Sequence, residues 1–431
     1  MSSYARVLRE PNFRNLFVGQ AASAIGDGVV VVAIALYVTQ STGSASALGA
    51  VLCAQTLPLV ALVLLGGVWA DRLPRHRIMI GADLVRAALH AALALLILAG
   101  GASVAEMVVI EAGYGAARAF FQPAYSGLLP QTVPESMIGD ARSLTESMAN
   151  LAELIGPALA TVLVLGVGAG EAFAFDAATF LVSALLLARV RPRARERQHA
   201  APPRASRSFA RELREGLQEV RSRTWVWVTI AMFAGSVLCM WAQWSALAPT
   251  VSRSLYGSVG VFGVLETVAG AGAVCGAFAS TRLRPAHPLA RGLAMTLIWP
   301  VQIAVFALGA PLPFVVVCAF GSGWSFALLL LWWETALAHH IPPRLLSRVS
   351  AYDWMGSLAL LPIGYLLAGP LAGAFGARNV LAAGSAIGFV LVLLALLPSA
   401  TRELRSRPEA GASELAAQGQ RAPEPHRVPA T

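Results

Sequence analysis

Residues 67–77 read Gly67-Val-Trp-Ala-Asp71-Arg72-Leu-Pro-Arg75-His-Arg77, and this charged segment separates two apolar runs at 47–70 and 78–99. Each run is long enough for an α-helix to cross a hydrocarbon core, which takes roughly 20 residues. A transmembrane barrel would instead show segments of roughly ten residues with alternating polarity, whereas these runs are continuous. We therefore expect the segment to be a tight turn between two membrane-spanning helices.

The whole chain repeats this pattern of apolar runs and short polar turns. Of its 431 residues, 57% are hydrophobic and 13% are charged, and the mean hydropathy is +0.65. Soluble domains carry about 25% charged residues, so the sequence predicts an all-α membrane protein with twelve transmembrane helices. The predicted spans are 15–38, 47–70, 78–99, 104–125, 140–166, 170–189, 225–248, 258–281, 289–309, 312–336, 347–374 and 378–398.

The distribution of arginine predicts the orientation of these spans. The chain has no lysine, so all 32 basic residues are arginines. Nearly all of them fall before the first span, in alternate connections or after the last span, and the other connections hold only Arg253 and Arg378. Basic residues concentrate on the cytoplasmic side of membrane proteins, so we expect both termini to be cytoplasmic and the protein to be a multi-pass component of the cell membrane. The net charge of +9 is then explained by topology and by anionic lipid, and no nucleic-acid partner is expected.

A polar, arginine-rich segment divides the chain into two halves. Residues 1–189 and 225–398 each hold six predicted spans, and residues 190–224 form a predicted cytoplasmic linker. The second part of this linker has the spacing of an amphipathic helix of the kind that lies on a membrane surface. The tail, 399–431, is polar and rich in proline and alanine, and we expect it to be disordered.

Several motifs resemble those of the major facilitator superfamily. Residues 67–77 are similar to its signature G-x-x-x-D-R-x-G-R-[RK], although Pro74 stands where the family has a glycine. Arg118-Ala-Phe-Phe-Gln-Pro123, Gly156-Pro157 and Gly369-Pro370 add to the likeness, and the two Gly-Pro pairs occupy equivalent places in the two halves. Together they resemble the exporter branch that includes the enterobactin exporter and macrolide-efflux proteins. This resemblance implies two pseudo-symmetric six-helix halves with a site between them near the bilayer midplane.

The resemblance also implies a role for the charged turn as a conformational lock, carried by Gly67, Asp71, Arg72 and Arg75. In the family, the carboxylate of Asp71 would meet the positive N-terminal end of the eleventh span. Arg72 and Arg75 would tie the helix ends together while one face of the transporter is closed. The alternative is that Asp71 only caps its helix and that the arginines only set the topology.

A second group is assigned to gating helices. It consists of Gly156 and Pro157 in the fifth span and Asp353 in the eleventh. Asp353 and Glu146 lie at matching places in the two halves, where they would cap or gate.

Three ionisable residues in the first half are candidates for proton coupling. Asp27, Arg118 and Glu153 lie within predicted spans 1, 4 and 5, where a charge costs at least about 2.5–3.5 kcal/mol on insertion scales. We expect Asp27 or Glu153 to carry a proton and Arg118 to tune its release. The alternative is a static buried ion pair that holds the three spans together. Asp83 and Arg86, three residues apart, are expected to form a local ion pair.

Aromatic residues suggest a substrate pocket in the second half. Trp241, Trp244 and Trp324 lie deep in their spans, and Glu266 is placed where it could reach a cavity. These residues could bind a drug-like or siderophore-like molecule, although simple packing explains the tryptophans better.

These features favour a proton-driven secondary transporter that exports a small organic molecule by alternating access. Uptake of a metabolite by the same fold, and a receptor or other non-transporting membrane protein, remain alternatives. The absence of lysine excludes a Walker A loop, and no metal-ligating or nucleophile–base motif is present. We therefore expect no enzymatic activity, no catalytic residues, no metal and no cofactor. The expected partners are the substrate, protons and lipid, and the expected state is a monomer.

Overall fold

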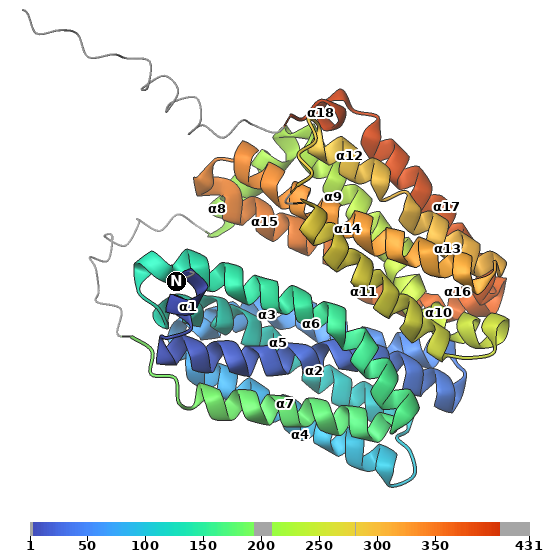
Figure 1. The fold of residues 1–431 in the computed structure, drawn as a ribbon, viewed down its shortest axis with the longest axis horizontal. Helices are drawn as coiled ribbons and strands as arrows, with labels where there is room; N and C mark the ends of the chain where they lie inside the picture. The colour runs from blue at the N-terminus through green and yellow to red at the C-terminus, as the bar shows by residue number, and fades with distance from the viewer. Residues whose placement is uncertain (1–2, 194–208, 281, 406–431) are drawn as a thin grey trace, which may run out of the picture.

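The computed structural model describes residues 3–193, 209–280 and 282–405, and its regular structure in these residues is helical throughout. Long helices form two bundles, one from each half of the sequence (Figure 1). The first bundle contains α1 (Ser3–Val7), α2 (Pro11–Thr42), α3 (Ala45–Arg72), α4 (Arg75–Leu98), α5 (Val104–Leu128), the 3-10 turns η1 (Leu129–Gln131) and η2 (Glu135–Met137), α6 (Ile138–Gly166) and α7 (Ala169–Leu187).

The second bundle follows α8 (Phe209–Ser222), a helix at the position of the predicted amphipathic segment. Its members are α9 (Thr224–Ser236), the π-helical turn η3 (Val237–Trp241), α10 (Ala242–Tyr256), α11 (Gly260–Ser280), α12 (Pro288–Met295), α13 (Ile298–Leu308), α14 (Leu312–His340), α15 (Pro343–Leu358), α16 (Leu361–Phe375), α17 (Ala377–Leu396) and α18 (Ser399–Arg402). Residues 194–208 of the predicted linker and 406–431 of the predicted tail lie outside the described residues.

Ten helical segments in the described residues are long and apolar enough to cross a membrane. Several of them combine consecutive elements, such as α9, η3 and α10 over Thr224–Tyr256. Two further predicted spans, α5 and α6, have 25 and 29 residues but carry more charge, including Glu111 and Arg118 in α5. The prediction of an all-helical, multi-pass membrane protein is therefore confirmed.

Short polar turns end one helix and begin the next, as between α2 and α3. Gly43 closes α2 with a φ of +62°, a left-handed conformation that favours glycine. The side chain of Ser44 then caps α3 by accepting a hydrogen bond from the Ala47 N–H at 3.2 Å. A turn of only two residues forces α2 and α3 to run in opposite directions.

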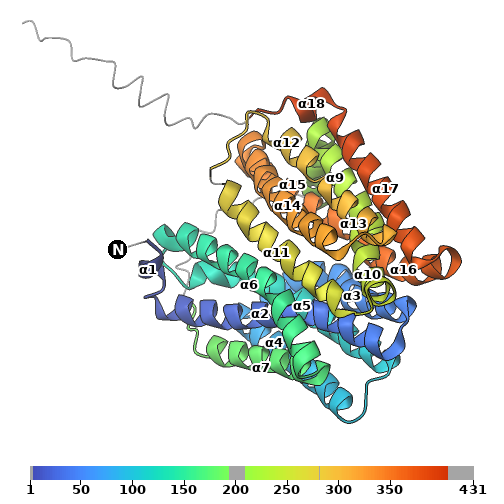
Figure 2. The same cartoon turned by 45° about the vertical axis from the view of Figure 1, so that its right-hand side comes forward.

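The two bundles meet at the end of the molecule away from the chain termini, called here the far end; the opposite end is the terminal end. At the far end α3 packs on α16, and α6 packs on α11 (Figure 2). Gly49 lies against the backbone of Tyr365, and Arg253 of the second bundle donates a hydrogen bond to the Thr39 carbonyl at 3.4 Å. A turn made by α2 and α3 is therefore held by the second bundle.

The apolar core, like the helix contacts, joins the two bundles at the far end. One continuous cluster at the far end draws on both bundles, and includes Val32, Leu48, Trp244 and Phe306. Towards the terminal end each bundle has a cluster of its own, one around Phe13 and Phe121 and the other around Trp225 and Trp333. The two bundles thus share a core at the far end and have separate cores at the terminal end.

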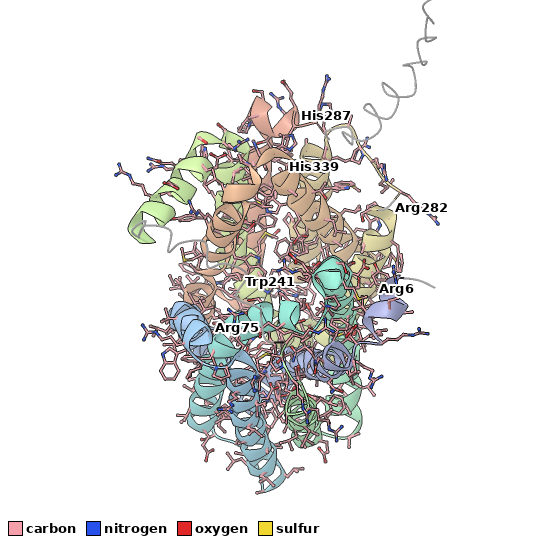
Figure 3. The ribbon with its side chains drawn as sticks, turned by 90° about the vertical axis from the view of Figure 1, so that its left-hand side faces the viewer. Arg6, Arg75, Trp241, Arg282, His287 and His339 are labelled. Atoms are coloured by element: carbon pink, nitrogen blue, oxygen red, sulfur yellow. The ribbon has the colours of Figure 1, made fainter. Side chains whose placement is uncertain are left out.

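The view from the terminal end places basic side chains of both bundles on this side, among them Arg6, Arg75 and Arg282 (Figure 3). Trp241 is seen between the bundles in the same view. At this end α8 packs on α15, where Arg348 forms an ion pair with Glu215 at 2.7 Å.

Candidate functional site

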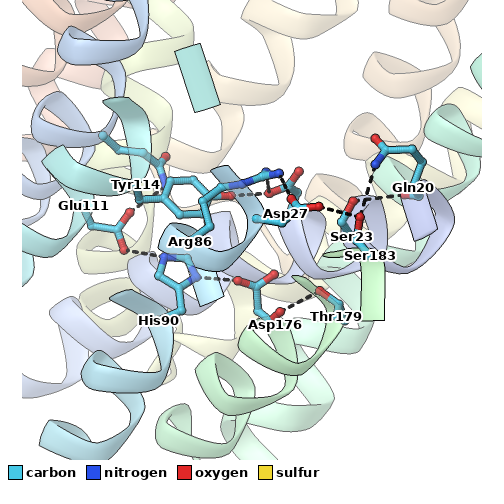
Figure 4. A network of polar contacts seen from close by, with 12 residues as sticks. Gln20, Ser23, Asp27, Arg86, His90, Glu111, Tyr114, Asp176, Thr179 and Ser183 are labelled. Atoms are coloured by element: carbon cyan, nitrogen blue, oxygen red, sulfur yellow. Dashed lines mark hydrogen bonds and ion pairs between the residues drawn. The ribbon is translucent and has the colours of Figure 1, made fainter. Parts of the chain in front are cut away.

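The first bundle buries a cluster of ionisable side chains contributed by four helices (Figure 4). Helix α4 supplies three of them from one face, spaced by three and four residues, and the rest come from α2, α5 and α7. The members of this buried charge cluster are Asp27, Asp83, Arg86, His90, Glu111, Tyr114 and Asp176.

Arg86 lies at one side of the cluster and is 1% exposed. It donates a hydrogen bond to Asp83, as the sequence predicts, and its Nη1 lies 3.8 Å from Asp27 Oδ1. The guanidinium also stacks over the rings of Phe121 and Phe180, 4.3 and 4.1 Å from their centroids. These contacts compensate a charge that would otherwise be costly to bury.

His90 lies at the other side of the cluster, between two carboxylates. Its Nδ1 forms a hydrogen bond with Asp176 Oδ2, and its Nε2 lies 3.5 Å from Glu111 Oε1. The Nε2–Oε1 pair is close enough for an ion pair but lacks the geometry of a hydrogen bond. Neither His90 Nε2 nor Glu111 Oε1 has a hydrogen-bond partner among the described residues. Glu111 is fixed through its other oxygen, which accepts a hydrogen bond from Gln55 Nε2 at 2.9 Å.

Tyr114 joins the two sides. Its ring stacks on the imidazole of His90, with centroids 4.4 Å apart and planes 5° apart. Its hydroxyl donates a hydrogen bond to Asp27. The carboxylate of Asp27 therefore contacts the ring that covers His90 as well as the guanidinium of Arg86.

Exposure distinguishes Asp27 from the other carboxylates. Its side chain is 26% exposed, whereas those of Asp83, Glu111 and Asp176 are fully buried. The cluster holds four carboxylates against one guanidinium and one imidazole. Because uncompensated charge is strongly disfavoured in a buried site, the excess of carboxylates together with the partial exposure of Asp27 makes this cluster a candidate site for a bound proton.

A cavity of about 210 Å³ lies between the two bundles. Helix α2 contributes Val31, Val32 and Ala35 to its wall, one to two turns beyond Asp27. The second bundle contributes aromatic side chains and one carboxylate, together with smaller apolar and polar residues. The aromatic and acidic residues are Trp241, Trp244, Phe262, Glu266, Trp299 and Phe326.

The structure brings together three of the four residues predicted for the substrate pocket. Trp241 and Trp244 line the cavity, and Glu266 Oε1 accepts a hydrogen bond from Trp244 Nε1 at 2.7 Å. Trp241 belongs to η3, a π-helical turn of a type often found at functional sites. Trp324 is not among the described lining residues, and its backbone instead lies against Gly276 of α11.

The residues predicted for proton coupling are arranged differently from expectation. Asp27 is in the cluster, but the cation beside it is Arg86 of α4. Arg118 is half-buried one turn from Tyr114, and no acidic side chain described by the structure lies within ion-pair distance of it. Glu153 belongs to α6, and its side chain lies outside the described residues.

Among the residues predicted to form the lock, Arg75 is the one whose side-chain contacts the structure describes. Its Nη1 donates to the Gly127 carbonyl at 2.8 Å, which ties the turn between α3 and α4 to α5. Arg72 is exposed, and the side chain of Asp71 lies outside the described residues. Gly67 faces open space, whereas its neighbour Gly66 lies against the backbone of Ala119. The close approach of α3 to α5 therefore depends on Gly66, the residue that precedes the motif.

The predicted gating residues lie at two separate contacts. Gly156 of α6 packs directly on Gly28 of α2, and a Cβ added at Gly156 would be 2.5 Å from the Gly28 Cα. Pro157 follows it inside α6, where its carbonyl accepts a hydrogen bond from Thr161 Oγ1. Asp353 accepts a hydrogen bond from Trp333 Nε1 at 2.9 Å, which joins α15 to α14.

Two helical bundles around a shared cavity define the class of protein as a membrane transporter of the major facilitator fold. A solved structure of a bacterial homologue of the human lysosomal transporter Spinster, described as inward-facing and unoccupied, has a TM-score of 0.67 to this chain at 17% identity. The likeness covers 94% of this chain and 99% of that one. At this identity it establishes the fold alone.

The sequence matches the family described as transmembrane secretion effector over residues 1–422, and the chain belongs to this family of the major facilitator superfamily. The multidrug efflux pump Tap of Mycolicibacterium fortuitum is 27% identical over 414 residues, 92% of this chain and 97% of Tap. Macrolide efflux protein A of Streptococcus pyogenes is 26% identical over 245 residues, which are 57% of this chain and 59% of that protein. The resemblance derived from the sequence motifs is confirmed.

Proposed function

We propose that the protein is a proton-coupled exporter of small organic molecules in the bacterial cell membrane, and that it acts as a transporter with no enzymatic step. Its twelve long helical segments, with α5 and α6 included, would all span the bilayer. The gathering of basic residues at the terminal end supports a cytoplasmic location for both termini. The relatives named for drug efflux support export over uptake.

One observation carries the proposal. The buried charge cluster has an excess of carboxylates over bases, and only Asp27 among its carboxylates is partly exposed. A static ion pair needs neither the excess nor the exposure. Proton exchange needs both, because a proton must be held in the bundle and must also reach solvent.

The arrangement suggests how protonation of Asp27 would affect the substrate cavity. When Asp27 is ionised it attracts Arg86, and when Asp27 takes up a proton that guanidinium is left with Asp83 alone. Asp27 and the cavity residues Val31 and Ala35 lie on the same helix, α2. A shift of α2 that follows protonation would therefore change the wall of the cavity.

The shared far-end core and the separate terminal-end cores support an inward-open state. In this state the far end is the closed external gate, and the cavity is reached from the cytoplasm. Export would require the contacts of α3 with α16 and of α6 with α11 to open while the terminal end closes. Alternating access would thus result from a rocking motion of the two bundles as rigid bodies.

Transport in everted membrane vesicles tests the proposal. With an acidic lumen, vesicles that contain the protein should accumulate a macrolide or another drug of a screened panel, and a protonophore should abolish the accumulation. Vesicles without the protein serve as the control. Gradient-driven loss of preloaded substrate from the lumen would instead indicate uptake, and indifference to the gradient across the panel would contradict proton coupling.

A further inference from the structure

The wall of the cavity carries a single acidic side chain among the described residues. Of the described residues that line it, Glu266 is the only charged one, and the polar remainder consists of Ser245, Gln302 and Ser322. No arginine or histidine in the described residues lies within ion-pair distance of Glu266; its hydrogen-bond partner is the indole of Trp244. A carboxylate in an apolar wall without a cationic partner is costly when ionised, and a bound cation would compensate it.

The aromatic side chains form a surface suited to the same kind of group. Trp241 meets Trp299 and Phe326 in edge-to-face contacts, with ring centroids 6.1 and 6.0 Å apart, and Trp299 meets Phe326 at 5.9 Å. Rings whose planes meet at 89°, 71° and 63° present faces as well as edges to their surroundings. Ring faces attract organic cations, and aromatic cages are used to recognise quaternary ammonium groups.

Further carboxylates lie nearer the terminal end. Glu334 of α14 is within charge–charge interaction range of Glu146 of α6 and Asp353 of α15, so acidic groups of both bundles lie near one another. By a helical rise of 1.5 Å per residue, each lies roughly 9–15 Å inside the terminal end of its helix. Behind the basic side chains of the terminal end, these three carboxylates would locally favour a cation over an anion.

We propose that the cavity selects lipophilic organic cations. The ammonium group of the ligand would lie beside the free oxygen of Glu266, and the adjoining apolar part would contact Trp241, Trp299 and Phe326. Drug-sized sites have volumes of roughly 300–1,000 Å³, so a cavity of about 210 Å³ takes the cationic end. The rest of a larger substrate extends towards the terminal end. This assignment of substrate class rests on the proposed transport function.

Binding to the purified full-length protein in lipid nanodiscs tests the assignment without requiring a gradient. The probes are 4-phenylbutyl-trimethylammonium and its neutral isostere, in which a tert-butyl group replaces the trimethylammonium group. Quenching of tryptophan fluorescence measures both affinities. The cation should bind about tenfold or more tightly than the isostere, because desolvated cation–π and charge contacts act on the cation alone.

Variants then test whether Glu266 is the source of the preference for the cation. Glu266→Gln should remove most of the preference for the cation while the isostere keeps its affinity within about twofold, and Glu266→Asp should retain part of it. Glu135→Gln, at an exposed position in the turn before α6, is the matched control and should change neither affinity. Equal affinities of the two probes for the wild-type protein would overturn the assignment even if a variant failed to fold, as would an unchanged preference in Glu266→Gln.

The two proposals fail separately. Cation-selective binding without gradient-driven transport would leave the substrate class standing and refute proton-coupled export. Gradient-driven transport of neutral molecules, together with no cation preference in binding, would refute only the assignment of the substrate class.

Discussion

Arg86 Nη1 lies 3.8 Å from Asp27 Oδ1, while the same guanidinium donates a hydrogen bond to Asp83 one turn away on its own helix. Arg86 thus joins α4 to α2 inside the first bundle, and its charge is shared between a fully buried carboxylate and a partly exposed one. Any change in the protonation of Asp27 must alter the balance between these two contacts. This relationship links the stability of the bundle to its proposed function.

Arg86→Met should destabilise the protein substantially. The substitution keeps an apolar side chain between Phe121 and Phe180 but leaves two carboxylates without their cation, and breaking a buried ion pair costs about 3–5 kcal/mol. Thermal unfolding in detergent should show a clearly lower midpoint. Arg72→Met, which removes an exposed arginine of the same bundle, is the control and should unfold near the wild-type temperature. Equal midpoints for the two variants would show that Arg86 does not stabilise the cluster.

His90→Phe should also destabilise the protein, although the new ring can still stack on Tyr114. The loss arises because Glu111 and Asp176 would face each other across an apolar ring with no base between them. The same unfolding measurement applies, with His287→Phe in the connection before α12 as the control. An undiminished midpoint for His90→Phe would indicate that the carboxylates are satisfied in another way.

The sequence predicted the helices well because their formation depends on local properties. A continuous apolar run of sufficient length must become a helix in a bilayer, since no water is present to satisfy its backbone groups. The spans predicted at 104–125 and 378–398 correspond to α5 and α17 with ends that differ by a few residues. The division into two halves follows from the position of one long polar segment, which is equally visible in the sequence.

The charge cluster could not be assembled in the same way, because it depends on how four helices are rotated about their axes. Arg118 was expected beside Asp27 from its depth in the bilayer, but depth does not determine which side of a helix faces a neighbour. The available signal was the spacing of Asp83, Arg86 and His90, which places three ionisable groups on one face of α4. Asp176 carried no such signal, since its nearest ionisable neighbours come from other helices.

Gly66, which precedes the charged turn motif, and Gly67, its first residue, should respond differently to substitution. Gly66→Ala places a methyl group against the Ala119 carbonyl, so α3 and α5 must separate, at a cost of about 1–3 kcal/mol. Gly67→Ala meets open space and should be neutral or stabilising by up to about 1 kcal/mol, because alanine favours the helix. Thermal unfolding of the two single variants compares them directly. A larger loss in Gly67→Ala than in Gly66→Ala would show that the packing of α3 on α5 differs from the one described.

A disulfide across the far end should stop transport reversibly. Thr161 of α6 and Gly263 of α11 come from different bundles, and a Cβ added at Gly263 would be 3.1 Å from the Thr161 Cβ. The Thr161→Cys, Gly263→Cys pair, in a background with the four native cysteines replaced, should cross-link under mild oxidation once the two helices separate slightly, because the Cβ atoms of a disulfide lie about 3.5–4.5 Å apart. Transport should fall to the level of vesicles without the protein and return on reduction.

The two single-cysteine variants provide the control for oxidation. If the cross-linked protein transported normally, the far-end contact would not be a gate, and the alternating-access proposal would lose its structural support.

Two transport modes of Asp27→Asn, compared in proteoliposomes, test most directly whether Asp27 exchanges the coupling proton. We expect this variant to lose accumulation driven by a pH gradient, because its amide cannot exchange a proton. It should still exchange labelled for unlabelled substrate across the membrane without a gradient, because the cavity is intact. Wild-type accumulation by Asp27→Asn under an imposed pH gradient would contradict the assignment of Asp27 as the proton-exchanging group.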